Sequence, residues 1–188
     1  DSKFAILRQA IYSLRETKRL LTVNVYGLGA MTHPGDLALV LQKAVTETLR
    51  KHKIELAVPT DYENYIEQIR QNPEIWNHLI DTHTALSSVV ADSDQLAESL
   101  KTGDLGIFHR VSDTLREAQL DIRLNNDNIK QWLCEVQDRL TELGTYNGLL
   151  IVWDEFTDVM TDAIGVPVLK QLQEVAQKLS LIHISEPT

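Results

Sequence analysis

Two stretches of the chain have the hydrophobic pattern of β-strands. Residues 20–26 are rich in β-branched and aromatic side chains, and residues 148–153 form an apolar run without a polar break. An uninterrupted run of this kind is typical of a strand that is buried on both faces, as in a parallel sheet. We therefore predict that 20–26 and 148–153 are parallel neighbours in one sheet, joined by a right-handed connection.

Most of the remaining chain has helical periodicity. Before the first strand, residues 3–18 place Phe4, Leu7, Ile11 and Leu14 on one side of a predicted amphipathic helix. Residues 54–58 fit either a short strand or a linker. The other predicted helices lie at about 36–52, from Thr60 to about 72, from Pro73 past Ile80, at 93–101, 104–120 and 126–143, and at 166–178.

This order of elements predicts a predominantly helical α/β fold, an incomplete three-layer domain with a helical insertion between two core strands. Residues 1–58 are the first part of the α/β core, and 59–145 are the insertion. Residues 146–178 supply the second strand and the helix after it.

The last ten residues, 179–188, resemble the translation of a sequencing adapter, read from the codons CTG TCT CTT ATA CAC ATC TCC GAG CCC ACG. We exclude them from functional reasoning and expect the source reads to carry those codons. An independent genomic clone with different codons there would contradict this expectation. The exclusion predicts a truncated reading frame, so that the chain is a fragment of a longer parent.

The composition of the chain argues against several classes of protein. No apolar segment approaches the roughly 20 residues of a membrane span, and no signal peptide is evident, although the chain starts at Asp1 rather than Met. The formal charge of −9 argues against a general nucleic-acid surface, although a nucleic-acid site in the parent stays open. The single cysteine, Cys134, excludes an intrachain disulfide and fits a reducing, cytoplasmic compartment.

The histidines do not form a metal-binding motif. His33, His52, His78, His83 and His109 lack the spacing of paired ligands on a helix.

The glycines after the first strand do not make a phosphate-binding loop. A Walker A loop requires GxxxxGK[ST], but Asp36 follows Gly35, and an anion there would repel phosphate. A dinucleotide fingerprint requires GxGxxG; Gly27 and Gly29 fit, whereas the third position is Thr32. A simple turn between strand and helix is favoured, and the dinucleotide site stays an alternative.

The apolar run at 149–153 ends in two adjacent carboxylates, Asp154 and Glu155. Ligands of open α/β sheets gather at the carboxyl ends of strands. The pattern resembles the hhhhDE form of the Walker B motif in P-loop ATPases of the ASCE class. The resemblance implies that Asp154 supports Mg²⁺ and that Glu155 activates water against the γ-phosphate of ATP. The plain structural alternative is a buried strand whose end meets water.

The resemblance is strong only over residues 148–178. Residues 20–52 are consistent with the strand and helix that precede Walker B in that family. It implies a P-loop upstream of Asp1, with 3–18 as the remainder of the following helix. Large ATPases of bacterial DNA-processing and phage-defence systems, including BREX-like ones, are similar in having a long helical insertion before Walker B. That analogy implies other subunits of a larger complex as partners.

Two other classes of function stay open. One is a helical protein-interaction module without catalysis. The other is a metal-dependent hydrolase that uses Asp154, Glu155 and Asp158, with or without Asp162. A GxxxxGK[ST] motif upstream would favour the ATPase. Without Walker A, we predict that this fragment alone is inactive.

Overall fold

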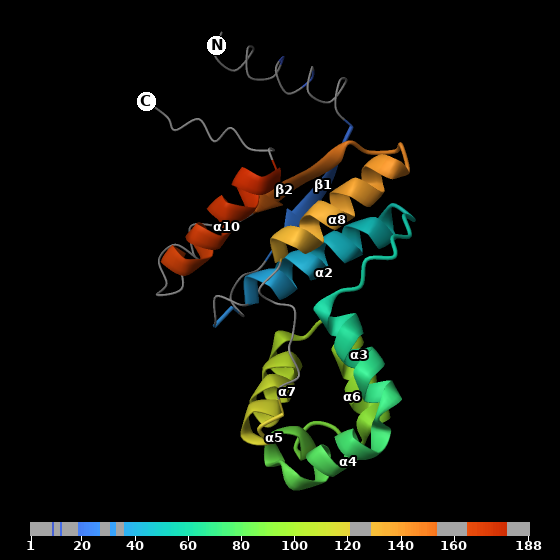
Figure 1. Ribbon diagram of the computed structural model, residues 1–188, viewed down its shortest axis with the longest axis vertical. Coiled ribbons are helices and arrows are strands. Elements are labelled where there is room, and N and C mark those ends of the chain that lie inside the picture. The colour runs from blue at the N-terminus through green and yellow to red at the C-terminus, as the bar shows by residue number, and fades with distance from the viewer. Residues whose placement is uncertain are drawn as a thin grey trace. The chain divides into compact units, whose positions relative to one another are not determined.

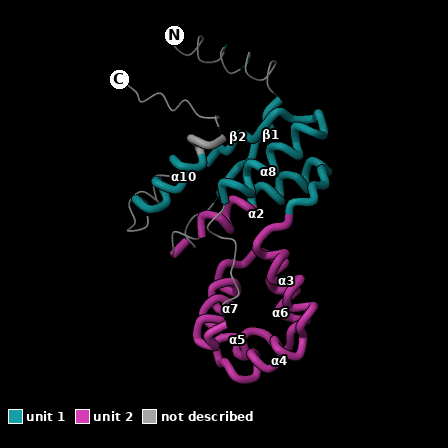
Figure 2. Tube along the Cα trace, viewed as in Figure 1, with its two compact units in different colours: residues 1–27, 44–58, 129–188 teal, residues 28–43, 59–128 magenta. Residues whose placement is uncertain are grey.

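The chain is predominantly helical, with a small parallel sheet (Figure 1). The computed structural model describes residues 9, 12, 19–26, 31–32, 36–120, 129–153 and 165–179, with side chains to 175 in the last stretch. The chain divides into two compact units (Figure 2). We call residues 1–27, 44–58 and 129–188 the sheet unit, and residues 28–43 and 59–128 the helical unit.

The sheet described consists of β1 (Leu20–Val25) and β2 (Gly148–Trp153). The strands are parallel, with Leu20 opposite Gly148 and Val25 opposite Trp153. This confirms the predicted parallel pairing, while the handedness of the connection stays a prediction. The backbone N–H of Asn147 donates to the carbonyl of Arg19 at 2.7 Å, so the pairing begins just before the strands.

The prediction that β2 is buried on both faces is wrong for the described structure. Leu149 is 5% exposed, whereas Leu150 and Val152 are each 45% exposed. Helix α8 (Ile129–Glu142) packs against β2, and α10 (Gly165–Leu179) packs against α8. The described helices of this unit therefore cover one face of the sheet, and alternate side chains on β2 face away from them.

The helical unit contains five helices among its described residues, together with the start of α2 (Asp36–Lys51). They are α3 (Asp61–Gln71), α4 (Pro73–Thr82), α5 (Thr84–Ser87), α6 (Ser93–Lys101) and α7 (Leu105–Glu117). Their apolar sides enclose one core, in which Trp76 is 2% exposed. The Phe108 ring meets the Tyr65 ring edge-on, with centroids 5.1 Å apart. Such aromatic pairs add about 0.5–1.5 kcal/mol beyond the area they bury.

Local signals set the helix boundaries. The Thr60 hydroxyl accepts the backbone N–H of Glu63, and the Glu63 carboxylate accepts the Thr60 N–H at 2.7 Å, which is the predicted capping box. Pro73 is the first residue of α4, where its missing N–H costs nothing. Gly144 has φ +69° just after α8, a backbone conformation that favours glycine.

Other predictions had mixed outcomes. Residues 54–58 are neither helix nor strand, so the linker alternative is correct. Helix α5 was not predicted, because four residues are too few to show a period. The predicted helix at 3–18 lies outside the described residues except for Gln9 and Tyr12, which are helical, and residues 180–188 also lie outside them.

None of the described helices has the combination of length and hydropathy that a membrane span requires.

Candidate functional site

The carboxyl ends of β1 and β2 lie side by side, and the predicted site follows directly from one of them. Val25 pairs with Trp153, so both strands leave the sheet at the same edge. Asp154 and Glu155 are the next residues after Trp153, but they lie outside the described residues. The same holds for Asp158 and Asp162, so the roles assigned to these four carboxylates stay predictions.

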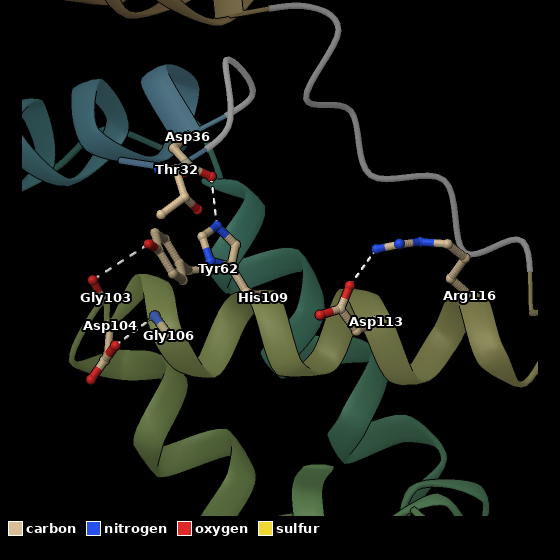
Figure 3. Close-up of polar contacts among 9 residues, drawn as sticks. All are labelled: Thr32, Asp36, Tyr62, Gly103, Asp104, Gly106, His109, Asp113 and Arg116. Atoms are coloured by element: carbon tan, nitrogen blue, oxygen red, sulfur yellow. Dashed lines mark hydrogen bonds and ion pairs between the residues drawn. The ribbon is translucent and has the colours of Figure 1, made fainter. Parts of the chain in front are cut away.

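The described residues bring a different set of polar groups together at the start of α2 (Figure 3). The Asp36 side chain is 4% exposed and accepts two hydrogen bonds. Its Oδ2 accepts the backbone N–H of Thr32 at 2.8 Å, and its Oδ1 lies 2.7 Å from Nε2 of His109 on α7. A His109 ring with its proton on Nε2 can donate to this carboxylate.

The Asp36–His109 contact joins two helices of the helical unit. Asp36 stands in the first turn of α2, where a negative charge is favoured by the helix dipole. The hydrogen bond from Thr32 holds the residues just before α2 to the first turn of that helix. The contact with His109 holds the first turn of α2 against α7. A buried carboxylate with two donors is a structural anchor, and one that orients an imidazole is also a common arrangement in catalysis.

A second group surrounds the carbonyl of Gly103, at the end of α6 (Figure 3). Lys43 Nζ donates to this oxygen at 3.2 Å. The Tyr62 hydroxyl lies 3.4 Å from the same oxygen, as Figure 3 shows. Burial raises the pKa of the Tyr62 phenol, and nearby carboxylates, led by Asp104, raise it further. Tyr62 therefore remains a neutral donor at physiological pH.

A third contact links α2 to the start of α3. Gln42 Nε2 donates to Asp61 Oδ2 at 3.2 Å, and the Asp61 backbone N–H donates to Gln42 Oε1 at 3.1 Å. Both side chains are buried. Burial raises the pKa of Asp61, and the hydrogen bond from Gln42 offsets part of that rise.

Sequence reasoning missed these contacts. From the sequence, Asp36 is only an anion that excludes a Walker A loop, and His109 is only a histidine without a metal-binding neighbour. The two residues are 73 positions apart, so no local spacing rule connects them. A buried Asp at the opening of a helix was the one available signal, because such a group requires donors.

Within the part of the chain that the structure describes, no three His, Cys, Asp or Glu side chains are grouped so that they could hold a metal ion. This leaves the predicted magnesium ligand, Asp154, untested, because it lies outside that part.

Comparison with models of protein families, with curated proteins and with solved structures finds no match for this chain.

Proposed function

We propose that this chain is part of an ATP-hydrolysing P-loop ATPase of the ASCE class. In this proposal β2 is the Walker B strand, β1 is the core strand before it, and residues 59–145 are the helical insertion between them. The observation that supports it is the parallel pairing of β1 with β2, although the whole helical unit separates them in sequence. If the two strands were unpaired or antiparallel, the structure would contradict the strand arrangement of the ATPase proposal.

The chemistry rests on Asp154 and Glu155. Carboxylate oxygens are the ligands that Mg²⁺ prefers, and the ion usually keeps several of its waters when a protein binds it. Asp154 would hold the ion through that water shell. A bound Mg²⁺ would neutralise charge on the phosphates. Glu155 would orient the attacking water and accept its proton.

ATP itself requires more than this chain provides. The 188 residues contain no GxxxxGK[ST] motif. The backbone amides of that loop cradle the phosphates, and its Lys reaches the β- and γ-phosphates. We therefore expect the chain by itself neither to bind ATP tightly nor to hydrolyse it.

For the parent we propose a large, cytoplasmic bacterial ATPase of DNA processing or phage defence, similar to BREX systems. Its partners would be other subunits of the same complex. The analogy rests on the long helical segment before β2. The net charge does not indicate a nucleic-acid surface on this chain, and a nucleic-acid site would belong to the rest of the parent.

A second candidate function is a helical protein-interaction module. Residues 59–128 contain thirteen acidic and five basic side chains, a formal charge of −8 within the −9 of the whole chain. The helical unit also has a core of its own. A module of this kind would favour a basic partner.

The test uses the intact parent with two single substitutions. Glu155→Gln should retain nucleotide binding and lose hydrolysis, because the amide keeps the shape of the side chain but cannot accept the proton. Asp154→Ala should in addition weaken Mg²⁺-dependent nucleotide binding. Equilibrium binding beside steady-state turnover separates the two effects. If both variants behave like the unaltered parent, the carboxylates are only the polar end of a strand. Metal-dependent hydrolysis without ATP would favour the hydrolase alternative.

A further inference from the structure

We draw no further inference here: the strongest candidate, the exposed apolar face of the small sheet at Leu150 and Val152 of β2, carries none because nothing in the described part of the structure shows what covers it.

Discussion

The helical unit and the sheet unit bury their apolar side chains to different extents. In the helical unit, side chains from six helices converge on one core, and Leu86, Leu96 and Leu100 have no exposed surface. In the sheet unit, neighbouring residues of one strand differ sharply, since Leu149 is 5% and Leu150 is 45% exposed. Among the described residues, the helical unit has an enclosed core, whereas β2 of the sheet unit exposes alternate apolar side chains.

This difference bears on function. In the ATPase proposal, residues 59–145 are the insertion, and most of the helical unit lies within them. A core strand depends on neighbours on both faces and both edges. The ATPase proposal therefore predicts further neighbours for β2 in the intact parent.

The largest expected effect is in the closed core of the helical unit. Trp76 is 2% exposed, and its ring lies 6.4 Å from that of Tyr65. Trp76→Ala should destabilise the helical unit by about 3–5 kcal/mol, because it leaves a cavity. The adjacent Ile75 is 55% exposed and is the matched control, with an expected cost within about 0.5 kcal/mol. Urea unfolding followed by circular dichroism compares them. Equal midpoints would show that Trp76 is not part of an enclosed core in the helical unit.

A smaller effect is expected at Asp36. Asp36→Ala leaves the Thr32 N–H and the His109 ring without this acceptor, which should cost about 1–3 kcal/mol. The control is Asp113→Ala, which removes an exposed ion pair with Arg116 on the same helix as His109, worth at most about 1 kcal/mol. Thermal unfolding of both variants checks this prediction. A larger loss for Asp113→Ala would show that the anchor is not at Asp36.

The smallest effect concerns the pH dependence that Asp61 contributes. Because burial raises the pKa of Asp61, the folded state holds its proton more tightly than the unfolded state, where the pKa is about 3.9. This group therefore lowers stability as pH rises from that value to its raised folded pKa, and the loss is complete above it. The Asp61→Asn variant has no carboxyl group at this position, so it does not titrate in this pH range. Its stability relative to the unaltered chain should increase with pH through that window and then level off. Urea midpoints from pH 3.5 upward measure this difference, and a constant difference would contradict it.

Much of the fold could be predicted because the signals are local. Thr60 and Glu63 stand at the spacing of a capping box, and Pro73 and Gly144 occupy positions that their backbones favour. The two strands were evident as apolar or β-branched runs, and their parallel pairing followed from the helices between them. The four-residue helix α5 offered no period to detect.

The remainder depends on tertiary context. An apolar run predicts burial of β2, yet sequence does not determine whether a cover lies over Leu150 and Val152. The Asp36–His109 contact joins helices that are distant in sequence, so only their packing brings the two residues together. The candidate site at Asp154 and Glu155 rests on a motif alone, since both residues lie outside the described part of the chain.

The most direct test of the central claim is ATP turnover by the intact parent carrying Glu155→Gln, measured together with equilibrium ATP binding. If β2 is a Walker B strand, turnover should fall on the order of 10²–10³-fold while ATP binding is retained, because one electrostatic contributor to the transition state is lost. Turnover equal to that of the unaltered parent, with the same ATP binding, would contradict the account. Asp154 and Glu155 would then be only the polar end of a strand.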